Sequence, residues 1–390
     1  MALGRPARDA PFMQGTRSLR RLASLSTTCL VAGLWAACSE PSPPLVDAGG
    51  DAGVVAPVAD AGERDAARGD DGGSEVPSDA GSSAGPILGT VADGEEIRIL
   101  GREFPEREHA RPLLWADFEE GTEPTAFGRL TEWASFNGER TDAERAPGSA
   151  HAIRLDHAAS SDAAGGSVSF EGDRLYIFIK RFYDTDITDP GSWGSRGFNH
   201  KTIRLWNRCG SECGYRQNNI YFGYQGSEGG NPRVVAEYTG ERTVWDGPAP
   251  TAGEWTQEEW LYRAGDVDAM NGTFDHVRGG VPQWEGRFRM RTSEYPGRYD
   301  RVFFDQVSNG TGPGPIYTYH DDVYVDTTWT RVMITDAPTL AGSRVREIQI
   351  PLEWSATEIR VLVRQGAHDT LDGRYLLVIG EDGSEQSFPL

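Results

Sequence analysis

The chain has 390 residues and a formal net charge of −21, and 25% of its residues are charged while 38% are hydrophobic. This length is enough for one large folded domain or for two. No basic cluster occurs after residue 37. The composition therefore argues against a nucleic-acid-binding protein, which needs a cationic surface to contact phosphates.

Residues 1–37 have the layout of a secretory signal peptide. Basic residues precede an apolar run from Leu22 to Ala37, which ends in small residues. The run is too short, and too rich in Ser and Thr, for a membrane span. Because Cys38 follows directly, the segment resembles a bacterial lipoprotein signal. This implies a lipid anchor at Cys38 and an outer-membrane or cell-surface location; the alternative is plain secretion with Cys38 unmodified.

Residues 38–85 predict a disordered, acidic linker. Between residues 39 and 85 there are ten acidic residues, two arginines and no aromatic residue. Such a segment cannot bury enough apolar surface to offset the entropy of ordering it. Its repelling charges extend it, so it serves as a tether.

From Pro86 onward the sequence predicts an all-β protein. Short segments of alternating or continuous apolar residues recur between glycine- and proline-rich turns, and long helical periods are absent. Many short strands with turn signals between them predict a sandwich or jelly roll. The clearest strand patterns are LYIFIK (175–180), KTIRLW (201–206), NIYFGY (219–224), DDVYVD (321–326), REIQI (346–350), EIRVLV (358–363) and RYLLVI (374–379).

The two ends of this region, residues 86–112 and 329–390, resemble the two halves of a TIG (IPT) immunoglobulin-like domain. In the first half, an apolar strand is followed by Gly101 and Phe104; in the second, a strand ends in Pro351 and Trp354. The resemblance implies a small β-domain built from both ends, because neither half can cover its apolar face alone. The alternative is two unrelated β segments packed on one larger sandwich.

Residues 113–328 form the predicted insert. It opens with a D-F-E sequence at residues 117–119 and closes with D-D-V-Y-V at 321–325, with Trp255 and Glu259 between them. This order resembles the concanavalin A-like jelly rolls of lectins and polysaccharide lyases. The resemblance implies a two-sheet sandwich and a carbohydrate ligand, without fixing an activity.

Strand alternation predicts which side chains leave the core. In KTIRLW, Ile203 and Leu205 are expected to face inward, and His200 and Arg204 outward. In LYIFIK, Ile177 and Ile179 are expected to face inward, and Tyr176, Phe178 and Lys180 outward. An open face with aromatic and cationic side chains suits a polysaccharide, because rings stack on sugars and cations pair with uronates. The alternative is ordinary core packing and solvated charge. The predicted ligand-binding residues are Lys180, Arg204, Trp206, Tyr221, Gln225 and Tyr324, with Asn199 and Lys201 ranked lower.

Three further predictions concern cross-links and metals. Cys209 and Cys213 are expected to form a disulfide in an oxidising compartment. The alternative, zinc bound with His200, lacks a further evident ligand. No catalytic metal or cofactor is expected, although a structural calcium near Asp305 or Asp321–Asp322 is an alternative.

The predicted function is non-catalytic binding of an extracellular polysaccharide or cell-surface glycan. One alternative is a lyase that cleaves a uronate polymer by β-elimination. There, Arg204 or Lys180 neutralises the carboxylate, His200 removes the proton, and a tyrosine (Tyr221, Tyr224 or Tyr319) protonates the leaving oxygen. The other alternative is a protein–protein adhesion module. The oligomeric state is not predicted.

Overall fold

The protein is described by a computed structural model that covers residues 86–157, 164–187, 199–207, 217–225, 231–244, 249–308 and 317–390. Every regular element in these ranges is a β-strand, so the predicted all-β class is confirmed. Among these residues, no helix is long and apolar enough to cross a membrane. The predicted signal peptide and linker, the lipidation site Cys38, and the pair Cys209 and Cys213 lie outside the described residues.

The larger body is a jelly-roll sandwich of a nine-stranded and a seven-stranded sheet. In the nine-stranded sheet the order is β15 (Val281–Trp284), β14 (Gly272–Arg278), β13 (Trp255–Arg263), β8 (Arg174–Tyr183), β18 (Tyr317–Asp326), β6 (Ala152–Asp156) and β5 (Glu139–Thr141), with β16 (Arg287–Phe288) beside β14 and β3 (Leu114–Ala116) beside β18. In the seven-stranded sheet it is β12 (Glu241–Val244), β11 (Pro232–Ala236), β10 (Asn218–Gln225), β9 (Asn199–Asn207), β17 (Arg301–Ser308), β7 (Gly165–Ser169) and β4 (Ala134–Phe136).

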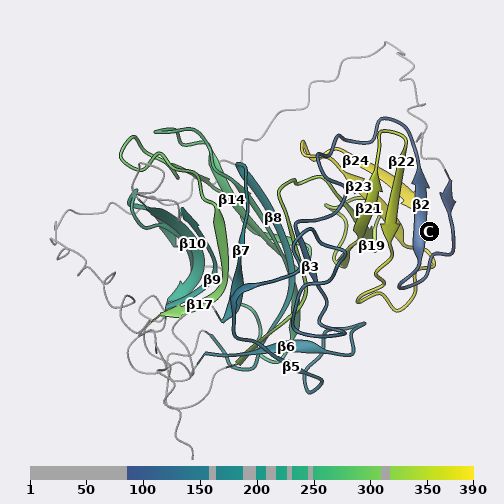
Figure 1. The fold of residues 1–390 in the computed structure, drawn as a ribbon, viewed down its shortest axis with the longest axis horizontal. Coiled ribbons are helices and arrows are strands. Elements are labelled where there is room, and N and C mark those ends of the chain that lie inside the picture. The colour runs from purple at the N-terminus through teal and green to yellow at the C-terminus, as the bar shows by residue number, and fades with distance from the viewer. Residues whose placement is uncertain are drawn as a thin grey trace, which may run out of the picture. The chain divides into compact units, whose positions relative to one another are not determined.

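A smaller sandwich contains strands from both ends of the folded region. Figure 1 shows the blue β2 beside the yellow-green β21 and β22. Its two four-stranded sheets are β1 (Ile87–Leu88), β2 (Glu96–Leu100), β22 (Glu358–Leu362), β21 (Ile350–Trp354), and β20 (Arg346–Ile348), β19 (Arg331–Thr335), β23 (Tyr375–Ile379), β24 (Glu385–Pro389).

The two ends of the folded region therefore pair with each other. Strand β2 is antiparallel to β22, with Ile97 opposite Val361 and Ile99 opposite Ile359. These four side chains are buried in one core with residues of β19 and β23. Each segment thus supplies the apolar partners that the other lacks. The likeness to TIG domains, and the domain boundaries, stay predictions.

Strand alternation decides which core each side chain of β8 joins. Ile177 and Ile179 pack between the two sheets of the larger sandwich, as predicted. Tyr176 and Phe178 point the other way, as predicted, but they pack against apolar residues of the smaller sandwich, including Met333. The expectation of an open surface at β8 is wrong, because the smaller sandwich covers this side of the nine-stranded sheet.

Lys180 lies in the same covered layer and is only 3% exposed. Its Nζ atom is 2.8 Å from Asp322 Oδ2 and 3.0 Å from Glu347 Oε2, so it joins β8 and β18 to β20. Burial opposes the charge of Lys180, but the two carboxylates outweigh burial and raise the pKa of its amine. Asp322 also contacts Arg364. Asp322, one of the carboxylates named above for a structural calcium, thus already pairs with two cations, Lys180 and Arg364.

Lys180→Met is expected to lower the free energy of unfolding by about 3–5 kcal/mol, because it leaves Glu347 buried without its cation and Asp322 with Arg364 alone. Urea unfolding of the full chain measures the change. Arg98→Met is the control: it breaks an ion pair with Glu358 in which Arg98 is 51% exposed, and its expected effect on the free energy of unfolding is much smaller, because water screens an exposed pair. Equal effects of the two substitutions would contradict the assigned role of Lys180.

Candidate functional site

A group of charged and aromatic side chains lies on the outer face of the seven-stranded sheet, opposite the core of the larger sandwich. We call the group the outer-face site. It is formed by three neighbouring strands, β9, β10 and β11, and the residue that follows β11. Its members are Lys201, Arg204, Tyr221, Arg233 and Glu237.

Strand β9 supplies Lys201 and Arg204 through an irregularity in its pairing. Phe222 of β10 pairs with Ile203, but the next residue, Gly223, pairs with Lys201, so β9 contains one extra residue, Thr202. A β-bulge of this kind reverses the alternation beyond it. Ile203 and Leu205 stay in the core as predicted. Lys201 instead turns to the outer face, and His200 turns inward.

The predicted orientation of His200 was therefore wrong. His200 is fully buried, and its Nε2 atom is 3.2 Å from Asp305 Oδ1. Its ring lies near those of Tyr183 and Tyr224, which belong to the core. Consequently His200 does not share a face with Arg204 and Tyr221, and it cannot act with them on one substrate.

Arg204 is fixed by three polar partners. Its Nε atom donates to Asn219 Oδ1 at 3.0 Å, Nη1 donates to Gln306 Oε1 at 2.7 Å, and Nη2 donates to Glu237 Oε2 at 2.8 Å. The guanidinium also lies 4.2 Å from the centroid of the Trp206 ring. This network holds a cation in one orientation, as recognition of a planar carboxylate requires.

Tyr221 lies at the centre of the site. The Nζ atom of Lys201 is 5.0 Å from the centroid of its ring, and the guanidinium of Arg233 is 5.3 Å from it. Tyr221 is 3% exposed, and Lys201 and Arg233 are 5% and 4% exposed. Two cations thus flank one phenol in a largely desolvated place, where electrostatic effects are strong.

These surroundings shift the pKa values of the site. Burial and, after it, the neighbouring Arg204 lower the pKa of the Lys201 amine to about 8, while Glu237 opposes the shift. Burial raises the pKa of Tyr221. Burial also acts to raise the pKa of Glu237, but Arg204 and Lys201 outweigh it and lower that pKa. Near neutral pH the site therefore combines an amine that loses its proton readily with a phenol that keeps its own.

The structure brings together four of the predicted ligand residues: Lys201, Arg204, Trp206 and Tyr221. Lys180 lies in the layer between the sandwiches, described above. Tyr324 lies in the same layer, where its hydroxyl donates to Asp326 at 3.0 Å. Of the other proposed proton donors, Tyr224 is a core residue, and Tyr319 packs against Phe182 of the nine-stranded sheet. The backbones of Asn199 and Gln225 pair at the ends of β9 and β10, and only their backbones are described.

Arg233 and Glu237 were not predicted from the sequence. They alternate with the core residues Val234 and Ala236, so strand parity over residues 233–237 places both on the outer face.

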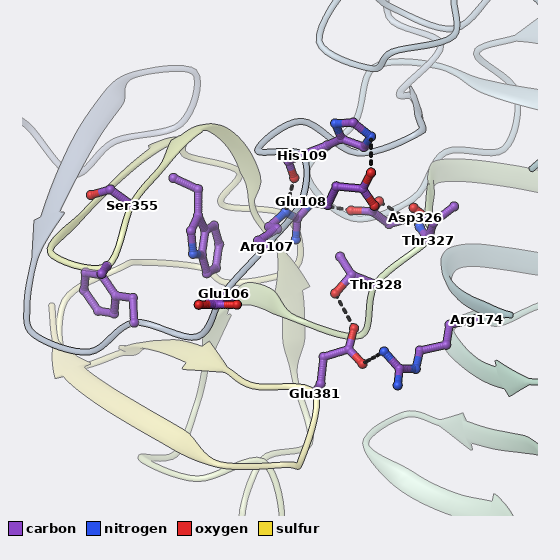
Figure 2. A pocket seen from close by; sticks show the side chains of 13 residues that line it. Glu106, Arg107, Glu108, His109, Arg174, Asp326, Thr327, Thr328, Ser355 and Glu381 are labelled. Carbon is purple, nitrogen blue, oxygen red and sulfur yellow. Dashed lines mark hydrogen bonds and ion pairs between the residues drawn. The ribbon is translucent and has the colours of Figure 1, made fainter. Parts of the chain in front are cut away.

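A cavity of about 780 Å³ lies elsewhere, where the two sandwiches meet (Figure 2). Arg174 and Glu381 form an ion pair of 2.6 Å in it, and Thr328 donates a hydrogen bond to the same carboxylate. Arg107 is paired with Asp326. The lining contains four carboxylates, Glu106, Glu108, Asp326 and Glu381, against two arginines, and none of the predicted ligand-binding residues, so we do not place the candidate site here.

The pKa values of the two lysine side chains can be measured directly, because the whole sequence contains only Lys180 and Lys201. In lysine-selective NMR of the full chain, Lys201 is expected to titrate near pH 8, while Lys180 stays protonated past pH 10. Glu237→Gln is expected to lower the pKa of Lys201 further, because it removes the carboxylate that raises it. The Lys201→Arg variant identifies the signal. Titration of Lys201 near its ordinary value of 10.5 would contradict the described burial.

No protein-family model matches the sequence, and no curated protein matches it. Among solved structures, the chain is similar to the alginate lyase Aly36B, with a TM-score of 0.36 and 12% identity over 56% of this chain and 98% of that one. It is also similar to an endo-β-1,4-glucuronan lyase from the fungus Trichoderma reesei (TM-score 0.34, 12% identity, 50% and 87% coverage). A third similarity is to the receptor-binding domain of botulinum neurotoxin type G (0.33, 8%, 69% and 72%). These values are too low to assign an activity to this chain.

Proposed function

We propose that the outer-face site binds an acidic polysaccharide rich in uronate and cleaves it by β-elimination. The observation that carries this proposal is the Lys201 amine, with a pKa of about 8, beside the protonated phenol of Tyr221. A β-elimination needs a base that removes the C5 proton and an acid that protonates the leaving oxygen, and the two groups must differ in pKa. The proposal replaces His200 as the base with Lys201.

The site residues divide the reaction between them. Arg204 and Arg233 pair with the uronate carboxylate, which makes the neighbouring C5 proton more acidic. The neutral Lys201 amine takes that proton, the C4–O4 bond breaks, and the electron pair of the C–H bond forms the C4–C5 double bond. The leaving O4 oxygen takes the phenolic proton of Tyr221. The proton on Lys201 then returns to the phenolate, which restores both groups.

The test is an assay of the full chain on uronate polymers, with a neutral glucan as the control polymer. Growth of ultraviolet absorbance reports the unsaturated product, and the rate is expected to rise with pH through about 8, as Lys201 loses its proton. Lys201→Arg and Tyr221→Phe are each expected to lower the rate roughly 10²–10⁴-fold, because each removes one proton-transfer group. Arg233→Gln is expected to weaken binding of uronate polymers specifically.

Arg154→Gln is the matched control, since Arg154 is an exposed arginine paired with Glu139, away from the outer-face site. It is expected to leave both rate and binding unchanged. Retention of the chain on uronate polymers without any absorbance change would overturn the lyase mechanism and favour non-catalytic binding. If the chain shows neither retention on uronate polymers nor a change in absorbance, the uronate ligand is overturned as well.

We also propose that the chain is a surface lipoprotein anchored through Cys38, with residues 39–85 as its tether. The apolar run directly before Cys38 and the acidic composition after it support this location. Expressed in a Gram-negative host, the full chain is expected in the membrane fraction, and Cys38→Ser is expected to release it as soluble protein. A wild-type chain recovered in the soluble fraction would contradict the anchor and favour plain secretion.

A further inference from the structure

Three side chains with metal-binding atoms meet inside the larger sandwich. They are His157, which follows β6, His200 of β9 and Asp305 of β17. One possible ligand atom from each lies within 4.8 Å of the others, and none of the three residues is more than 1% exposed. The cluster therefore joins both sheets of the sandwich from within its core.

The strands deform to bring these groups together. Asp305 has a positive φ of 48°, which is uncommon for any residue other than glycine. It lies level with the bulge residue Thr202 in the neighbouring strand, between the pairs Phe304–Ile203 and Gln306–Lys201. Strain and bulges of this kind occur where a side chain must be redirected. Here they turn an imidazole and a carboxylate into the interior of the sandwich, beside the buried Arg181 and Thr318.

The spacing suits a metal with nitrogen and oxygen ligands. His200 Nε2 and Asp305 Oδ1 are 3.2 Å apart. Two ligands of a tetrahedral zinc ion, each about 2.0–2.2 Å from the metal, are separated by roughly 3.3–3.5 Å. The possible ligand atom of His157 lies within 4.8 Å of both.

Neighbouring residues support the carboxylate in the manner of a second coordination shell. The hydroxyl of Thr318 donates to Asp305 Oδ2 at 2.8 Å, and Arg181 Nη2 lies 3.5 Å from Asp305 Oδ1. Contacts of this type orient a metal-ligating carboxylate. They fix the position of Asp305.

His320 of β18 is a further neighbour of Asp305. Its Nε2 atom lies 2.6 Å from Asp305 Oδ2 and donates a hydrogen bond to it. Thr318 and His320 thus both hold Oδ2, while Oδ1 faces His200 and Arg181.

We infer that His157, His200 and Asp305 bind one zinc ion that holds the two sheets together. Two imidazoles and a carboxylate form a donor set of borderline character, which suits zinc better than calcium or magnesium. Burial inside the core makes the role structural, with a water molecule as the fourth ligand of the tetrahedral ion. This site differs from the zinc alternative considered at Cys209 and Cys213, and it does not depend on the proposed lyase reaction.

The test measures zinc in the purified full chain after dialysis against a chelator. About one equivalent of zinc per chain is expected, and Asp305→Asn and His157→Gln are each expected to reduce retained zinc at least tenfold. His276→Gln is the matched control. His276 is an equally buried histidine in the same core, stacked on Trp260 at 3.8 Å, and its loss costs packing while leaving zinc content unchanged.

A second measurement keeps the inference testable if the ligand variants do not fold. Cobalt replaces zinc in the wild-type chain, and its spectrum is expected to show bands of a nitrogen–oxygen site without thiolate charge transfer. A Cys209→Ser/Cys213→Ser double variant is expected to retain its zinc. Any one of three results would overturn the site. They are a wild-type chain that retains no zinc, a thiolate band in the cobalt spectrum, and loss of zinc from the double variant. None of these results depends on polysaccharide cleavage, so the zinc site and the lyase fail separately.

Discussion

One irregularity in β9 determines both the outer face and the interior of the larger sandwich. The extra residue Thr202 reverses the alternation of the strand, so that His200 points inward and Lys201 outward. Regular alternation would put His200 on the same face as Arg204 and would bury Lys201 in the apolar core. Since a one-residue change in register exchanges the two faces of a strand, no side-chain rotation can substitute for this bulge.

The two lysines of the chain show how surroundings, rather than residue type, set the charge state. Both are nearly buried, at 3% and 5% exposure, on opposite outer faces of the larger sandwich. Lys180 faces two carboxylates, which raise the pKa of its amine and make it a structural cation. Lys201 lies among guanidinium groups, and burial together with Arg204 lowers its pKa. Desolvation is common to both, so the sign of the neighbouring charge decides the outcome.

The sequence predicted the fold well wherever a strand is regular. Alternation in β8 correctly assigned Ile177 and Ile179 to the core, and the two apolar halves at the ends of the folded region do pair. Alternation failed at His200, because a bulge at an ordinary threonine leaves no mark in composition. The burial of Lys180 was equally hidden, because it depends on which surface the smaller sandwich covers. His157, His200 and Asp305 are far apart in sequence, and only the closed sandwich brings them together.

The interior cluster and the outer-face site share a backbone, and this has a mechanical consequence. His200 and Lys201 are adjacent residues of β9, so whatever fixes the imidazole also fixes the Cα position from which the lysine side chain starts. Asp305 and Gln306 repeat the arrangement in β17: Asp305 contacts His200 inside, while Gln306 accepts from Arg204 outside. Strands β9 and β17 thus each carry one residue that makes a polar contact inside the sandwich and, directly after it, one residue on the outer face. Because a packed core resists deformation, the polar contacts inside the sandwich determine the positions of Lys201 and Arg204 on its outer face.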